Sequence, residues 1–185
     1  MSDKTEFADI SILPRTLGLT EVEDTRERRE LLVARCGERL VGVFADEAEQ
    51  VTAWKQPSPL PGAPRAVLGV VSVRGRIYTL LDPLTILGER QGAEAASFAF
   101  IITLRGDEQL ALAVERAERI IEIFADDVEP LGSSRSAGVV LGLLQTEGKL
   151  VAVLNVRELF AAALRGTERR RRRQGKSQND EQLNH

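Results

Sequence analysis

The sequence predicts a mainly β protein made of two small barrels of about five strands each, followed by a short C-terminal helix. Two observations predict this fold. Runs rich in Val, Ile and Leu alternate with short glycine-containing breaks, which is typical of strands joined by hairpins. The pattern also occurs twice: Leu68-Gly69-Val70-Val71 is echoed by Leu141-Gly142-Leu143-Leu144, and Arg74-Gly75-Arg76-Ile77 by Glu147-Gly148-Lys149-Leu150, at a constant offset of 73 residues.

This internal duplication divides the chain into two related halves, roughly residues 30–90 and 97–164. Upstream of the glycine pairs, Glu38–Val51 is mirrored by Glu108–Ile120 with one residue fewer. Each half is therefore expected to supply one barrel, and the repeat leaves open whether strands are exchanged between the two barrels.

Four X-Gly pairs mark the expected hairpin turns, because such tight turns need a positive φ that glycine adopts without steric cost. They are Cys36-Gly37, Arg74-Gly75, Arg105-Gly106 and Glu147-Gly148. One further strand is expected in each half, at Val51–Trp54 and at Ile120–Phe124. About five strands per half are enough to curl into a small barrel.

Two short helices are expected where each half ends. Asp82 can cap a helix that has Pro83 at its first position and ends at Gly88. Asp82 could instead be a catalytic carboxylate, but capping explains it better. In the second half, Asn155 is expected to cap the helix of "VRELFAAALRG", whose apolar side chains have helical spacing for packing on the body; they are Leu159, Phe160 and Leu164.

The composition excludes several classes of site. The 185 residues include one cysteine, Cys36, and one histidine, His185. A disulfide, a Cys/His zinc site, a histidine-based catalytic relay and a bound cofactor are therefore not expected. Residues 1–15 contain three acidic side chains and no long apolar run, which disfavours a signal peptide or a membrane span and predicts a cytoplasmic location.

The two ends differ from the body in composition. Residues 1–29 form an N-terminal extension that is either a flexible tether or a cover for apolar surface. Residues 165–185 form a basic tail, expected to be disordered, with five consecutive arginines at Arg169–Arg173. Residues 1–164, by contrast, carry 18 basic and 25 acidic side chains and are acidic overall.

One stretch carries a resemblance to a known family. The segment "LPGAPRAVLGVVSVRGRIYTLLD", Leu60–Asp82, is similar to the CheW-like family of bacterial chemosensory adaptors, and a looser likeness covers residues 30–164. The resemblance implies two five-stranded SH3-like barrels packed on one another. It also implies a non-enzymatic adaptor that couples methyl-accepting chemoreceptors to a CheA-type histidine kinase, that binds no small-molecule substrate, and that meets the membrane only indirectly, through receptor arrays.

The resemblance further implies two sets of contact residues. The receptor-binding set consists of Arg74, Gly75, Gly69, Ala99, Phe100 and Ile120. The kinase-binding set consists of Ala48, Gln50 and Val51. Arg74 is the central expectation, since a turn held by Gly75 would aim its guanidinium at a partner. Gln50 stands where the family tends to have Glu, so the charge of the kinase contact differs from the family pattern.

Two rival functions belong to other classes. A small-barrel nucleic-acid-binding protein would use the arginine tail, but the tail has no aromatic residue to stack on bases and the body is acidic. An enzyme would need a working carboxylate pair such as Asp46/Glu47 or Glu115/Glu118. No phosphate-binding glycine loop or cluster of metal ligands accompanies these pairs, so the sequence favours the adaptor.

Overall fold

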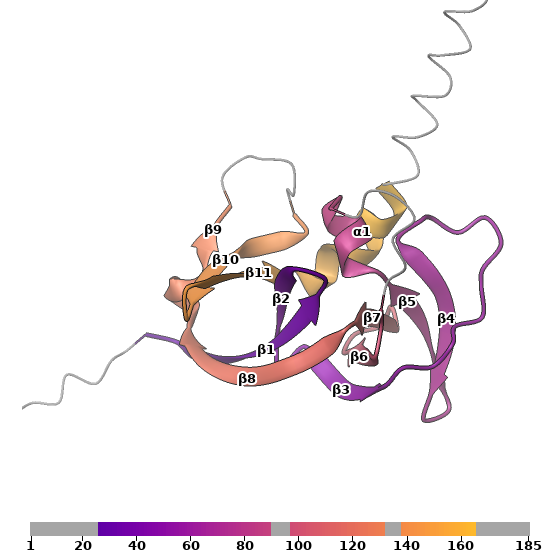
Figure 1. The fold of residues 1–185 in the computed structure, drawn as a ribbon, viewed down its shortest axis with the longest axis horizontal. Helices are drawn as coiled ribbons and strands as arrows, with labels where there is room; N and C mark the ends of the chain where they lie inside the picture. The colour runs from indigo at the N-terminus through magenta and orange to yellow at the C-terminus, as the bar shows by residue number, and fades with distance from the viewer. Residues whose placement is uncertain (1–25, 90–96, 132–137, 166–185) are drawn as a thin grey trace, which may run out of the picture.

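The computed structural model describes residues 26–89, 97–131 and 138–165. In these ranges the chain forms two curved sheets that lie side by side, each curled into a small barrel (Figure 1). The strands are β1 (Arg28–Cys36), β2 (Arg39–Phe44), β3 (Ala48–Ala53), β4 (Val67–Val73), β5 (Arg76–Leu81), β6 (Phe100–Leu104), β7 (Leu110–Val114), β8 (Arg116–Phe124), β9 (Glu129–Pro130), β10 (Val140–Thr146) and β11 (Lys149–Leu154). The mainly β fold class is confirmed.

Each barrel contains strands from both halves of the repeat. One sheet runs β3-β6-β7-β5-β4 and forms what we call the middle barrel; the other runs β8-β1-β2-β11-β10-β9 and forms the terminal barrel. The exchange is reciprocal, because β2 lies parallel to β11 while β7 lies parallel to β5. The barrels therefore do not coincide with residues 30–90 and 97–164: each half gives its first two strands to the barrel that holds the rest of the other half.

All four expected turns join consecutive antiparallel strands. In the β4–β5 turn Arg74 has φ 49° and Gly75 has φ 82°, and in the β10–β11 turn Glu147 has φ 48° and Gly148 has φ 72°. Positive φ at both central residues is the type I′ geometry, which matches the twist of the flanking strands. The sequence indicated positive φ only for the glycines, whereas Arg74 and Glu147 share it.

A second pair of equivalent glycines lets backbone segments approach each other. A Cβ at Gly69 would lie 2.3 Å from the carbonyl oxygen of Ser58, and a Cβ at Gly142 would lie 2.4 Å from that of Glu129. Both glycines also sit where the strand register shifts. Each glycine therefore both allows a close backbone approach and lies at a β-bulge or similar irregularity of its strand.

The apolar core has three parts. One cluster fills the middle barrel around Tyr78, Leu80 and Ile101, and a second fills the terminal barrel around Leu31 and Val151. The third and largest lies between the barrels and draws residues from both sheets and both helices, including Leu32, Leu112, Leu154 and Leu159. Packing between the barrels thus fixes one sheet relative to the other.

The first helix agrees with its prediction. In α1 (Pro83–Leu87) the side chain of Asp82 accepts a hydrogen bond from the backbone N–H of Leu84 (3.1 Å), and Gly88 ends the helix with φ 76°. The Asp82 carboxylate also accepts the hydroxyl of Thr85 at 2.6 Å. Asp82 is thus a capping residue, buried at the helix start.

The C-terminal helix differs from its prediction in two respects. It begins as the 3₁₀ turn η2 (Val156–Glu158) and continues over residues 159–165, and the Asn155 side chain makes no capping hydrogen bond. Leu159 is buried as expected, but Phe160 and Leu164 are 36% and 44% exposed. The buried stripe runs instead from Leu159 to Ala163, one turn later on the same face, which directs Phe160 and Leu164 outward.

The predictions for the two ends lie outside the described residues, apart from residues 26–29 and 165. Of the helices in the described ranges, none is long and apolar enough to span a membrane.

Candidate functional site

The β4–β5 turn holds the central candidate of the receptor-binding set. Arg74 is exposed and forms no ion pair with any described residue. Gly75 beside it is open, since a Cβ there would meet nothing within 4 Å. The turn therefore presents an unpaired guanidinium on a backbone of defined geometry, as a partner contact requires.

The other members of the receptor-binding set do not all lie together. Gly69 is buried, and its missing side chain makes room for Ser58 of the same chain. Phe100 pairs with Val114 in the middle barrel, and Ile120 pairs with Leu32 in the terminal barrel. Since Val114 and Leu32 belong to the cluster between the barrels, Phe100 and Ile120 lie on the outer barrel faces that carry that cluster.

Both side chains are accessible there, with Phe100 36% and Ile120 58% exposed. Ala99 is also exposed and accepts a backbone hydrogen bond from Trp54.

The kinase-binding set lies on β3, the last strand of its sheet. Ala48 is paired with Leu104 and Gln50 with Thr103, so Glu49 is the extra residue of a β-bulge. Val51 is 42% exposed and lies beside Phe100, because Val51 pairs with Ile102 and Ala53 pairs with Phe100. The structure thus makes parts of the two predicted sets neighbours on β3 and β6.

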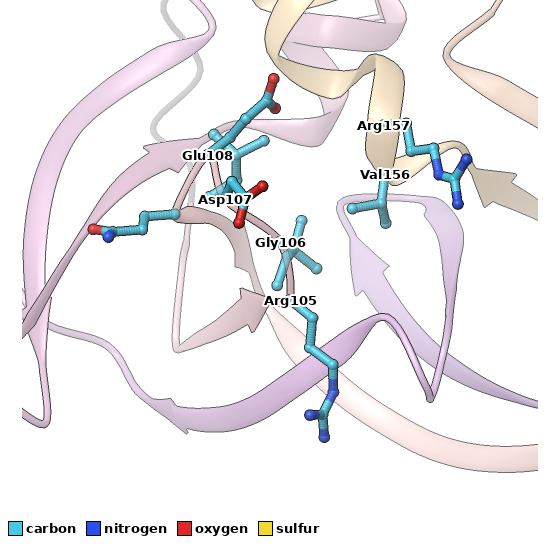
Figure 2. Close-up of a pocket in the computed structure, with 9 residues that line it drawn as sticks. Arg105, Gly106, Asp107, Glu108, Val156 and Arg157 are labelled. Atoms are coloured by element: carbon cyan, nitrogen blue, oxygen red, sulfur yellow. The ribbon is translucent and has the colours of Figure 1, made fainter.

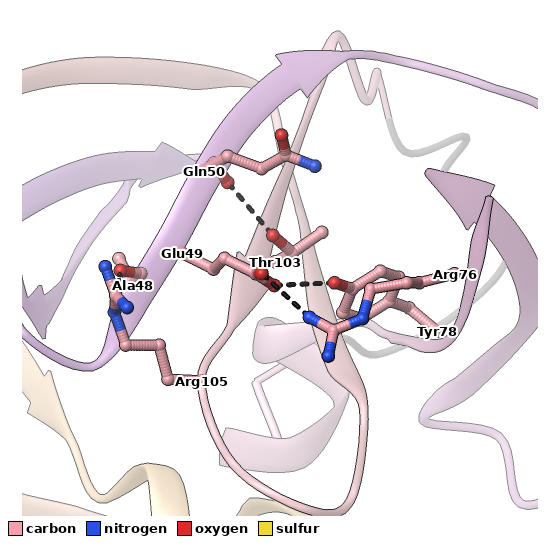
Figure 3. Close-up of polar contacts among 7 residues, drawn as sticks. All are labelled: Ala48, Glu49, Gln50, Arg76, Tyr78, Thr103 and Arg105. Carbon is pink, nitrogen blue, oxygen red and sulfur yellow. Dashed lines mark hydrogen bonds and ion pairs between the residues drawn. The ribbon is translucent and has the colours of Figure 1, made fainter. Parts of the chain in front are cut away.

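The bulge residue Glu49 is a site residue that the sequence did not indicate. Figure 3 shows its carboxylate between two side chains of β5: Arg76 Nη1 donates to Oε1 (2.9 Å), and the Tyr78 hydroxyl donates to Oε2 (2.5 Å). The hydrogen bond from Tyr78, more than the charge of Arg76, lowers the pKa of Glu49, and the same bond raises the pKa of Tyr78. Only the tertiary fold brings β3 and β5 together, so no local sequence signal could have found this contact.

Arg76 lies two residues after Arg74 and forms an ion pair with Glu49, on the strand that carries the kinase-binding set. The β4–β5 turn and β3 belong to the same barrel and are tied together by this bridge.

Two hollows flank the β6–β7 loop. One, of ≈ 340 Å³, lies between the loop and the start of η2, and Figure 2 shows its lining residues. The other, of ≈ 360 Å³, is lined by Glu49, Arg76 and Tyr78 together with the loop. Both share Arg105, whose Nε donates to the carbonyl oxygen of Ala48 at 3.0 Å. The loop therefore borders the β3 surface.

One carboxylate of each pair named for the alternative enzyme function is held in an ion pair. Arg29 Nη2 donates to both carboxylate oxygens of Asp46 (2.9 and 3.0 Å), and Glu118 is paired with Arg35 at 2.7 Å. Glu47 is partly buried, and this burial, with the charge of Asp46, raises its pKa. Within the described residues no group of three His, Cys, Asp or Glu side chains is placed to hold a metal.

Comparison with known proteins agrees with this architecture. Residues 30–164 match the family model of the CheW-like domain. The chain is 24% identical over 139 residues to "Chemotaxis protein CheW" of Rhizobium meliloti (74% of this chain, 90% of the relative). It is 25% identical over 142 residues to "Protein FrzA" of Myxococcus xanthus (75% of this chain, 89% of the relative).

A solved structure has the same fold. The scaffolding protein TtCheW from Thermoanaerobacter tengcongensis superposes with a TM-score of 0.64 at 20% identity, covering 75% of this chain and 91% of that one. Because the family model covers most of the sequence and the double-barrel fold agrees with it, the chain belongs to the CheW-like domain family.

Proposed function

We propose that this protein is a non-enzymatic adaptor that couples methyl-accepting chemoreceptors to a CheA-type histidine kinase. The observation that carries the proposal is the CheW-like match over residues 30–164, which contains the intact Arg74-Gly75 turn. Its matched relatives include proteins named for chemotaxis, and the protein of similar fold is named as a scaffold. The adaptor would act in the cytoplasm, at receptor arrays on the inner face of the membrane.

The positions of the two predicted contact sets on one barrel support this role. Arg74 projects from a type I′ turn toward one partner, while Ala48, Gln50 and Val51 lie on the terminal strand of the same sheet, available to another. The ion pair between Arg76 and Glu49 ties the turn to that strand. Two proteins bound to one barrel would be held at a fixed spacing, which is the requirement for a coupler and involves no bond-making chemistry.

The test is titration calorimetry of the full chain with the cytoplasmic tip of a cognate receptor and with the cognate kinase. We expect binding to each in the micromolar range, which corresponds to about 8 kcal/mol. We also expect the protein already saturated with receptor tip to bind the kinase. Absence of binding to both partners at high protein concentration would contradict the proposal.

A further inference from the structure

Two of the three acidic side chains around β3 are ion-paired within the chain, and the third is partly buried. Both oxygens of Glu49 are used, one by Arg76 and one by Tyr78. Upstream of the strand, Asp46 is held by both oxygens in its pair with Arg29. Glu47 is partly buried, and the charges of Arg29 and Arg157 act on its carboxylate. Glu49 and Asp46 are thus neutralised by arginines of the same chain, while Glu47 Oε2 is buried without a hydrogen-bond partner among the described residues.

A cation reaches the start of β3 from the neighbouring strand, because Arg105 directly follows β6. The Arg105 backbone N–H donates to the carbonyl oxygen of Glu47 (2.8 Å), and its side-chain Nε donates to that of Ala48 (3.0 Å). Its guanidinium is exposed and forms no ion pair with the rest of the described chain. These two hydrogen bonds fix where the charge is presented, so little side-chain entropy remains to be lost when a partner binds.

The acids of the β6–β7 loop do not neutralise this charge. Asp107 and Glu108 lie on the same loop, but Figure 2 shows their carboxylates directed away from the Arg105 guanidinium. Figure 3 shows that guanidinium beside Ala48, at the start of β3. Next along the strand, the Glu49 carboxylate is ion-paired to Arg76 and also lies within the field of the Arg105 charge, while Gln50 is an amide and Val51 an exposed apolar side chain. The β3 surface thus combines the exposed apolar Val51, the Glu49 carboxylate paired with Arg76, and the Arg105 guanidinium, which forms no ion pair among the described residues.

We infer that Arg105 is the charged anchor of the kinase contact and that the kinase surface facing β3 presents a carboxylate to it. This inference rests on the proposed function, and it specifies the chemistry of one partner. The Nη groups of Arg105 can donate two parallel hydrogen bonds to a carboxylate, and the exposed Val51, three residues further along β3 than Ala48, supplies apolar contact area.

The experiment compares kinase affinity of the full chain with that of three variants. Arg105→Glu should weaken kinase binding about 10-fold or more, since it replaces a charge-assisted contact by a repulsion. Arg105→Lys keeps the charge but loses the fork, and should cost only a few-fold. The matched control is Arg65→Glu, which makes the same charge change at another exposed arginine with no ion pair to a described residue, and it should leave the affinity unchanged.

Salt and receptor binding complete the test. At about 1 M salt, where the Debye length falls to about 3 Å, the gap between wild type and Arg105→Glu should shrink markedly. Receptor-tip binding should not change in any variant, and all variants should stay folded, with the Arg105 variants losing only the exposed hydrogen bond from Nε to Ala48.

The outcomes separate the inference from the function on which it rests. If wild type binds the kinase and Arg105→Glu binds it equally well, the inference is wrong and the proposed function stands. If Arg105→Lys and Arg105→Glu lose affinity equally while both remain folded, the positive charge is not the anchor and the inference is again wrong. If wild type binds the receptor tip but no kinase, the inference and the kinase half of the proposed function both fail.

Discussion

The β4–β5 and β10–β11 turns have the same backbone conformation, but they carry opposite charges at the equivalent position, and only the acidic side chain is ion-paired within the described chain. Arg74 and Glu147 occupy equivalent positions of the repeat with φ values of 49° and 48°. Glu147 is held by Arg119 of β8 at 2.7 Å, whereas Arg74 is paired with no described residue. The fold therefore requires the turn but not the charge, and at this equivalent position Glu147 is ion-paired whereas Arg74 pairs with no described residue.

The largest expected effect comes from the pair of glycines behind these turns. Gly142→Ala and Gly69→Ala would each place a Cβ within 2.4 Å and 2.3 Å of a backbone oxygen that cannot move cheaply. We expect each to destabilise the protein by about 3 kcal/mol or more, measured by denaturant unfolding. Gly75→Ala is the control, because its Cβ meets nothing within 4 Å and only φ is unfavourable. Equal losses at Gly142 and Gly75 would show that the close approach does not matter.

The next effect tests whether the two turns are equivalent in backbone energy. Gly75→Val and Gly148→Val force a β-branched residue to φ values of 82° and 72°. Each should cost about 1 to 3 kcal/mol in unfolding free energy, with similar values for the two turns. Arg74→Asn, by contrast, should be neutral or slightly stabilising, because Asn tolerates the left-handed region. A large difference in unfolding free energy between the two valine variants would contradict the equivalence of the two turns.

The binding role of the turn is tested by removing each charge. Arg74→Ala should weaken receptor-tip binding by about 1 to 3 kcal/mol, the range for a charge-assisted contact. Its unfolding free energy should stay within about 0.5 kcal/mol of wild type. Glu147→Ala, which removes an exposed ion pair, should leave receptor binding unchanged. Equal loss of receptor and kinase affinity in Arg74→Ala would indicate general distortion and not a lost contact.

The smallest effect concerns Glu47, which lies in the connection from β2 of the terminal barrel to β3 of the middle barrel. Burial raises the pKa of Glu47, so the folded state holds its proton more tightly than the unfolded chain does. The stabilisation that Glu47 provides therefore increases as the pH falls from neutral, through the raised pKa, to the ordinary pKa of a glutamate. Above the raised pKa the side chain is charged, and its partly buried position makes that charge unfavourable. Glu47→Gln should stabilise the protein at neutral pH by less than about 1 kcal/mol.

Stability must be measured as the difference between Glu47→Gln and wild type across pH. Glu49 and Glu118, whose pKa values are lowered by hydrogen bonds from Tyr78 and Arg35, contribute a slope of the opposite sign in both proteins. A difference that does not change between neutral and mildly acidic pH would contradict the role assigned to burial.

What the sequence could predict was local or repeated. The four turns, the added strands at β3 and β8 and the cap at Asp82 follow from turn chemistry, alternation and capping rules, and the structure has them all. The pairing of β2 with β11 and of β5 with β7 could not be predicted from the sequence, because it joins strands that are far apart along the chain. The Glu49–Arg76–Tyr78 contact and the exposure of Phe160 depend on that tertiary arrangement. Arg74 was identified through the family resemblance; its φ and lack of a described ion-pair partner required coordinates.

The placement of β1 and β2 has a consequence for how the chain folds during synthesis. The middle barrel is contiguous from β3 to β7 and can close as soon as β7 has left the ribosome. The β1–β2 hairpin is made first, yet the strands that pair with its two outer edges, β8 and β11, come about 70 or more residues later, or roughly 4 to 15 seconds at usual translation rates. During that interval the hairpin has two open edges, each able to pair with a neighbouring nascent chain. Any segment or chaperone that covers those edges early would raise the yield of folded adaptor without adding to its final stability.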